Sequence, residues 1–117
     1  MRKTNIELDQ MLYEMRPLLD RKGLIGMAAA RNTRVITDAI QEYASVKVDL
    51  IRKYGQDDGD GGIGIDPSSD AFAEFMAEIE PYAQMSHDID VMKVPTEKVM
   101  DDMTGAEMLA LDWMLEG

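Results

Sequence analysis

The sequence predicts a mainly α (α+β) domain of four helices, one of them long and central, with a small two-stranded antiparallel β element. Apolar residues recur every three to four positions over most of the 117 residues, which is the spacing of one helix face. Two short segments, residues 63–65 and 88–94, have the alternation or composition of a strand instead. The length suits a single domain, residues 1–117, because domains most often contain about 100–150 residues.

The first helix is expected to begin at Thr4 and to end near Arg16. Thr4 and Glu7 have the spacing of a capping box, in which each side chain accepts a hydrogen bond from the other residue's backbone N–H. Pro17 limits this helix, because proline has no N–H and disfavours helical backbone in the residue before it. A turn closed by residues 22–23 should follow.

The long central helix is predicted over residues 26–54, a stretch without proline. Its apolar residues form one broad stripe. Arg52 and Lys53 suit the negative end of the helix dipole, and Gly55 is a natural residue at the helix end. At about 1.5 Å per residue the helix would be roughly 40 Å long, so we expect it to be either the spine of the domain or half of a helix–helix interface.

The second half of the chain begins with a loop rich in glycine and aspartate at residues 56–66. A third helix follows and is expected to end near Pro81, and a short helical turn should begin at residues 95–97. The last helix is predicted to start at Thr104, which has a glutamate three residues later, as in a second capping box. We expect the two short strands to pair with each other, joined by the third helix.

Composition and charge limit the classes of function. The chain has no cysteine, so disulfides, thiolate metal sites and cysteine nucleophiles are excluded. The net charge is −11, of which residues 1–55 carry +3 and residues 56–117 carry −14. Such an acidic field repels nucleic-acid phosphates and anionic membranes, so we expect no direct nucleic-acid binding. Because we find neither a signal peptide nor an apolar run of roughly 20 residues, we expect a cytoplasmic protein that does not enter membranes.

The acidic half has two interpretations. It is either a solvated face that keeps a small domain soluble, or a docking surface for a protein partner with a basic surface. Flexible methionines fill irregular cores but also line adaptable grooves, and tryptophan is enriched at binding hot spots. The candidate protein-binding residues are therefore Asp57, Asp58, Asp60, Asp101, Asp102, Met108, Asp112 and Trp113.

The loop of the second half partly matches a calcium-binding EF-hand. With Gly61 at loop position 6, Asp58 and Asp60 fall at positions 3 and 5. Gln56 and Pro67 then occupy positions 1 and 12, where charged ligands belong. A plain turn is therefore preferred to a calcium site.

We predict no catalytic residue, no metal ligand and no cofactor. His87, the one histidine, stands beside Asp88 without a nucleophile or a second metal ligand. Carboxylate pairs are abundant, but acid–base catalysis needs one of them in an apolar pocket, and nothing in the sequence indicates this. The motifs GxGxxG, GxSxG and HExxH and the P-loop motif are absent from the sequence. We therefore do not expect an enzyme.

Three places in the chain resemble a group of small acidic phage and prophage proteins. The first is the start KTNxEL at residues 3–8, leading to RNTR at residues 31–34. The second is LIRKYG at residues 50–55, which runs into the acidic loop, and the third is MTGAEMLALDWMLE at residues 103–116. The resemblance implies a viral origin and an infected bacterial cytoplasm. The family has no settled activity, so the resemblance assigns no functional residues.

The leading hypothesis is a non-enzymatic phage or prophage accessory protein that binds a host or viral protein through its acidic surface, for example as an inhibitor of a host nuclease or defence factor. The alternative is a virion structural or assembly protein that acts as a homo-oligomer through the long helix. A calcium-binding module is the third and least favoured hypothesis.

Overall fold

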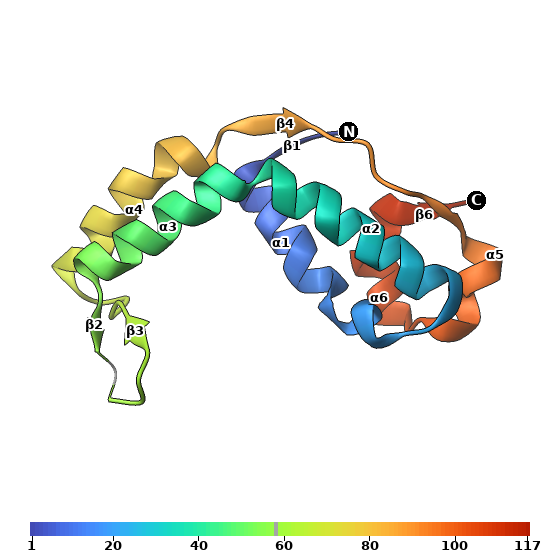
Figure 1. The fold of residues 1–117 in the computed structure, drawn as a ribbon, viewed down its shortest axis with the longest axis horizontal. Coiled ribbons are helices and arrows are strands. Elements are labelled where there is room, and N and C mark those ends of the chain that lie inside the picture. Colours follow the sequence, from blue (N-terminus) through green and yellow to red (C-terminus); the bar gives the residue numbers. More distant parts are fainter. Residues whose placement is uncertain (58) are drawn as a thin grey trace.

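The computed structural model describes residues 1–57 and 59–117, and these residues form a mainly helical fold (Figure 1). They contain six α-helices where the sequence predicted four. The α-helices are α1 (Asn5–Met15), α2 (Gly23–Ala39), α3 (Gln41–Tyr54), α4 (Asp70–Ala83), α5 (Thr96–Val99) and α6 (Gly105–Ala110). Short 3-10 helices are η1 (Arg16–Asp20), η2 (Met100–Asp102) and η3 (Asp112–Met114). The strands are β1 (Arg2–Thr4), β2 (Gln56–Asp57), β3 (Ile63–Gly64), β4 (Ser86–Asp88), β5 (Val94–Pro95) and β6 (Leu115–Glu116).

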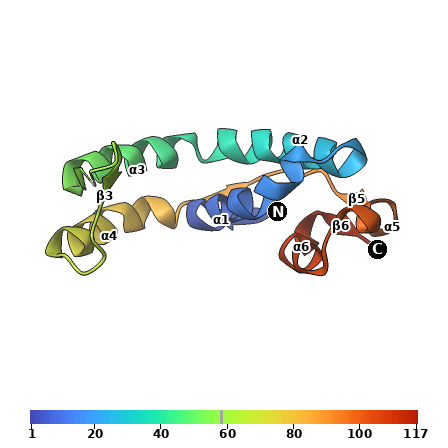
Figure 2. The ribbon, with the colours of Figure 1, turned by 90° about the horizontal axis from the view of Figure 1, so that it is seen from below.

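The larger helices lie in two rows along the long axis of a molecule that measures 49 × 32 × 21 Å. Figure 2 shows α2 and α3 end to end in one row, with α1 and α4 in the other. α1 packs against α2, and α4 packs against α3. Residues 94–117, which we call the cap, lie against the α1–α2 pair at the end far from α3 and α4 (Figure 1). We call α1, η1, α2 and the cap the body, and residues 41–83 the arm.

The body contains the closed hydrophobic core. Fully buried large side chains come from each of its layers, and burying one such side chain stabilises the fold by about 1.5–3 kcal/mol. The body residues of this kind are Leu8, Met15, Leu18, Ile25, Ile36, Val94, Val99, Leu111 and Met114.

One buried polar side chain, Asn32 on α2, fixes the segment between β4 and β5. Its Nδ2 donates to the carbonyl of Met92 at 2.9 Å, and its Oδ1 accepts from the Met92 N–H at 2.6 Å. The amide therefore satisfies both backbone groups of a residue that belongs to no strand. Asn32 is fully buried, so these hydrogen bonds are shielded from water.

The prediction of a single helix over residues 26–54 is wrong, because the helix breaks at Ile40. Ile40 has φ −97° and ψ 11°, outside the α region, and it separates α2 from α3. Backbone hydrogen bonds still cross the break, from the Ile40 N–H to Ile36 and from the Ala44 N–H to Ile40. No proline or glycine stands here, so the bend comes from tertiary packing: it lets α2 lie on α1 while α3 lies on α4. The second extra helix, α5, is the helical turn expected at residues 95–97.

The predicted helix ends are mostly confirmed. Thr4 and Thr104 both form complete capping boxes, and α1 ends at Met15, before Pro17. The expected end near Pro81 is wrong by two residues, because α4 continues to Ala83. Proline in the last turn removes only one helical hydrogen bond, which the buried Ala83 side chain helps to offset.

The predicted pairing of the two short strands is wrong. β3 pairs with its neighbour β2 in an antiparallel hairpin, since closing a short loop costs little entropy. The segment 88–94 is not one strand. Its start lies in β4, which pairs antiparallel with the N-terminal β1, and its end lies in β5, which pairs parallel with the C-terminal β6. In the part of the chain that the structure describes, three two-stranded sheets therefore replace the one that was expected.

Candidate protein-binding site

The structure divides the predicted binding residues between two ends of the molecule (Figure 1). Asp57 and Asp60 lie in the β2–β3 hairpin at the end of the arm, and Asp58 lies outside the described residues. The remaining five are all in the cap, and they are Asp101, Asp102, Met108, Asp112 and Trp113. The seven described residues of the prediction therefore lie in two separate groups.

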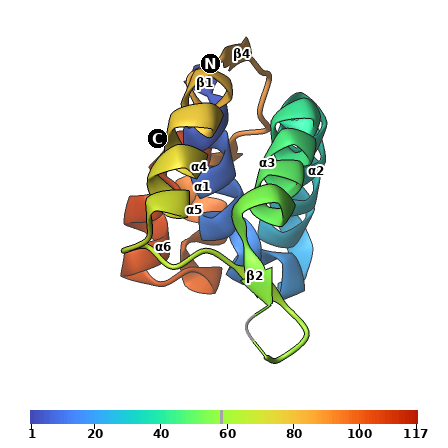
Figure 3. The ribbon, with the colours of Figure 1, turned by 90° about the vertical axis from the view of Figure 1, so that its left-hand side faces the viewer.

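The hairpin aspartates shape a turn. Figure 3 shows the hairpin extending away from α3 and α4, which lie side by side. The Asp57 Oδ1 accepts a hydrogen bond from the Gly59 N–H at 2.8 Å, as aspartate commonly does in turns. Among residues 1–57 and 59–117, no three His, Asp or Glu side chains are grouped as ligands of a metal ion.

The cap is attached to the rest of the body by a bidentate ion pair. Arg21, which follows η1, donates from Nη1 to Glu107 Oε1 at 2.6 Å and from Nη2 to Glu107 Oε2 at 2.7 Å. Arg21 Nη1 also donates to the carbonyl of Asp102. The guanidinium of Arg21 lowers the pKa of the Glu107 carboxyl, and the hydrogen bonds to Glu107 raise the pKa of Arg21. Glu107 also caps α6 at Thr104, so one carboxylate orders both the start of α6 and its contact with the body.

The outer surface of the cap combines carboxylates with exposed apolar side chains. Asp101, Asp102 and Asp112 are exposed, and none of them forms an ion pair with a residue that the structure describes. Leu109 is 84% exposed and Met100 is 50% exposed, which is unusual for large apolar side chains within one short segment. We call these residues, with the half-buried Met108, the cap surface: Met100, Asp101, Asp102, Met108, Leu109 and Asp112.

Trp113 does not belong to the cap surface. It is half-buried against the body and lines a shallow groove of about 440 Å³ together with residues of β1 and α1, among them Ile6 and Met11. Its indole Nε1 is buried without a hydrogen-bond partner among the described residues. That Trp113 contacts a protein partner stays a prediction, and its position would place this contact in the groove and not on the cap surface.

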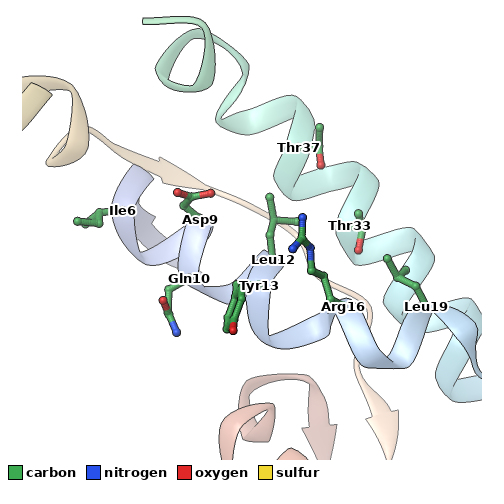
Figure 4. Close-up of a pocket in the computed structure, with 9 residues that line it drawn as sticks. All are labelled: Ile6, Asp9, Gln10, Leu12, Tyr13, Arg16, Leu19, Thr33 and Thr37. Atoms are coloured by element: carbon green, nitrogen blue, oxygen red, sulfur yellow. The ribbon is translucent and has the colours of Figure 1, made fainter. Parts of the chain in front are cut away.

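A second groove, of about 490 Å³, lies between α1 and α2, and its walls are both polar and apolar (Figure 4). Arg16 lines the groove and forms no ion pair with a described residue, while Asp9 is paired with Lys47 at 3.1 Å. Thr33 and Thr37 face α1 across this groove, and the buried Thr33 hydroxyl has no hydrogen-bond partner among the described residues. The groove differs in charge from the cap surface.

Comparison of the chain with protein-family models, curated proteins and solved structures gives no match. None of the helices in the described residues has both the length and the apolar composition for crossing a bilayer.

Proposed function

We propose that the chain is a non-enzymatic phage or prophage accessory protein that binds a host or viral protein with a basic surface. The observation that carries the proposal is the cap surface, where exposed Met100 and Leu109 belong to the same short segment as three carboxylates without ion-pair partners in the described chain. Protein interfaces combine a central apolar patch with a polar rim. Carboxylates on the rim accelerate the encounter with a basic partner. The viral origin, and with it the bacterial cytoplasm, rests on the three resembling places: residues 3–8 with 31–34, residues 50–55 and residues 103–116.

Inhibition of a host nuclease or defence factor is the form of this function that we favour. Enzymes that act on nucleic acid carry basic surfaces, because phosphates dominate their binding. A protein with sixteen Asp and Glu and only two Lys or Arg in residues 56–117 has the charge to occupy such a surface.

The test is affinity capture from infected bacterial lysate with the wild type and two matched variants. The first variant carries Asp101→Asn and Asp102→Asn in the cap, and the second carries Asp57→Asn and Asp60→Asn in the hairpin. Both variants remove two negative charges, the first from the cap and the second from the hairpin. We expect the cap variant to bind the captured protein at least tenfold more weakly and the hairpin variant to bind it within about twofold of the wild type.

The captured protein should also bind more weakly as salt is raised, because exposed charges are screened over about 10 Å at 0.1 M salt. A single substitution, Leu109→Ser, should weaken binding at all salt concentrations, since it removes apolar contact and no charge. Equal loss in the cap and hairpin variants, or affinity that does not depend on salt, would contradict the proposal.

The assembly role is the second candidate, and the arm favours it. Ile63 in the hairpin is 50% exposed, and Val48 and Met76 are exposed on α3 and α4, so the arm offers apolar contacts to a second copy. Light scattering of the purified protein separates the two functions. A closed homo-oligomer that Met76→Glu dissociates would support assembly, and a monomer at all accessible concentrations would exclude it.

A further inference from the structure

A cleft of about 550 Å³ lies where the body joins the arm. Five parts of the chain supply its walls: the start of α1, the end of α2, the first turns of α3, the end of α4 and the segment leading into β4. Figure 1 shows these element ends meeting around the bend between α2 and α3. The volume is many times the roughly 30 Å³ that one water molecule occupies, so the cleft can hold a side chain.

The charge of this cleft is negative. Asp38 and Glu42 stand at its rim, on either side of the Ile40 break, and both are exposed. Neither forms an ion pair with a residue that the structure describes, although Arg34 stands one helical turn before Asp38. No lysine or arginine lines the cleft in the described chain. A ligand that enters therefore meets two carboxylates that no cation neutralises.

The walls between these carboxylates are largely apolar and aromatic. Tyr43 is buried at the base, Val46 is half-buried, and Tyr82 and Met85 are 40% and 53% exposed. Apolar and aromatic walls suit the hydrocarbon stem of a long cationic side chain, whose charged end remains near polar groups. An aromatic face such as that of Tyr82 also attracts a cation within about 6 Å.

The hydrogen bonds of Asn5 show which form of His87 faces the cleft. Asn5 is buried, and its Nδ2 donates to the carbonyl of Tyr82 at 2.8 Å. Its Oδ1 must then accept the hydrogen bond of 2.9 Å from the His87 ring, so His87 Nε2 carries the proton. In the neutral ring Nδ1 is consequently an acceptor, and it has no partner among the described residues. His87 thus adds an acceptor to the residues that line the cleft. Lys47, whose ammonium lies 5.8 Å from the centre of the Tyr43 ring, is already paired with Asp9.

From these observations we infer that the junction cleft binds a lysine or arginine side chain of a protein partner. The two rim carboxylates bind the charged group, and Val46, Tyr82 and Met85 contact its stem. The inference rests on the proposed function, because the occupant belongs to a bound protein, and it adds a second contact site distant from the cap surface. A side chain bound in this way contacts both the body and the arm, because Asp38 belongs to α2 and Glu42 belongs to α3.

The experiment uses arginine amide as the probe and the full chain labelled with ¹⁵N, so that no partner needs to be known. Citrulline amide is the matched control, because it has nearly the same shape and the same α-amino group but lacks the charge of the guanidinium group. We expect arginine amide to shift the backbone resonances of residues 38–46 and 82–87 in a saturable way, and citrulline amide to shift them at least fivefold less. Nuclear Overhauser effects from the arginine side chain to the Met85 methyl should place the stem in the cleft.

Matched variants test the two carboxylates. Asp38→Asn with Glu42→Gln should weaken binding of arginine amide at least fivefold, whereas Asp101→Asn with Asp102→Asn in the cap should change it less than twofold. Both pairs are exposed, and unchanged circular dichroism will show that the fold is kept. Equal binding of citrulline amide, shifts centred outside the cleft, or equal loss in the two double variants would overturn the inference.

These results are independent of the capture experiment. Probe binding in the cleft without any effect of the cap variant on capture would reject the proposed cap surface and leave the cleft site standing. The reverse result would reject the cleft and leave the cap surface standing.

Discussion

The body and the arm are built from similar helices but differ in how completely they bury them. In the body, large side chains such as Leu18 and Leu111 are entirely enclosed, because three layers (α1 with η1, α2 and the cap) meet around them. In the arm only two helices meet. Its best-buried large side chains, Tyr43, Phe75 and Ile79, remain 4–8% exposed, and many others are half-buried.

The contact between the two arm helices leaves its large apolar side chains partly exposed, so we expect the arm to be less stable than the body. Regions with few fully buried apolar contacts open locally at lower free energy than the global unfolding of the chain. α3 and α4 are joined near the hairpin by an exposed ion pair, Lys53–Glu78 at 3.0 Å, and exposed pairs contribute little. We therefore expect the body to set the stability of the protein, and the arm to be the part that adjusts when a partner binds at the junction cleft or when copies associate.

The largest expected effect tests this division directly. Leu18→Ala in the body should lower the free energy of unfolding by about 2–5 kcal/mol, because it leaves a cavity in a closed core. Leu50→Ala in the arm removes the same atoms from a half-buried site and should cost less than about half as much. Urea denaturation followed by circular dichroism measures both. Equal losses would show that the arm is as closed as the body.

The second prediction concerns the two hydrogen bonds between the buried Asn32 side chain and the backbone of Met92. Asn32→Ala leaves the N–H and carbonyl of Met92 buried without partners and should cost about 2–4 kcal/mol. The neighbouring Thr33→Val is the control, because the Thr33 hydroxyl has no hydrogen-bond partner in residues 1–57 and 59–117. It should leave stability within about 0.5 kcal/mol or raise it slightly. Hydrogen exchange should show the Met92 amide losing protection only in Asn32→Ala. Unchanged protection there would mean that another group holds the segment.

The contrast also explains which features the sequence could predict. Helix starts at Thr4 and Thr104 and the end before Pro17 follow from side chains within one turn of the feature, so local chemistry sufficed. The break at Ile40 has no proline or glycine and depends on α1 and α4, which only the folded chain brings into place. The prediction of strand pairing was wrong for the same reason. The segments 63–65 and 88–94 pair with other parts of the chain, and local alternation does not specify which strands pair.

The binding residues divide in the same way. Exposed carboxylates of the cap, such as Asp101, could be predicted from composition and from their position between apolar residues. The junction cleft could not, because Asp38, Glu42 and His87 come from parts of the chain up to about fifty residues apart and meet only at the bend. The one sequence signal for it was His87, which is the sole histidine, but the sequence did not show that Asn5 fixes its proton.

A third prediction concerns the close packing at Gly55, where α3 meets the hairpin. A Cβ added at Gly55 would lie 2.4 Å from the Ile51 carbonyl oxygen and 2.4 Å from the Ile63 Cγ2. Gly55→Ala should therefore push the hairpin away from α3 and cost about 1–3 kcal/mol. Gly64→Ala, in the paired strand, meets nothing within 4 Å and should be neutral or slightly stabilising. We expect hydrogen exchange to rise in residues 50–57 and to stay unchanged in α1 and α2. Faster exchange in the body would show that arm and body unfold together.

The smallest expected effect concerns the ion pair between Arg21 and Glu107, which attaches the cap to the rest of the body. Glu107→Gln should lower stability at pH 7 by about 1–2 kcal/mol, because it removes the charge from two hydrogen bonds with Arg21. The folded-state pKa of Glu107 lies below its unfolded value of about 4.3. Its contribution is therefore fully present above that pH and is lost as the pH falls through the folded-state pKa. The difference between wild type and Glu107→Gln should stay constant from pH 7 to about 5 and shrink toward pH 3 in thermal or urea unfolding. Glu97→Gln, which removes a cap carboxylate that is exposed and has no ion pair in the described chain, should stay within about 0.5 kcal/mol of the wild type throughout. Equal stability of the wild type and Glu107→Gln at pH 7 would mean that packing of α6, and not the charge on Glu107, attaches the cap to the rest of the body.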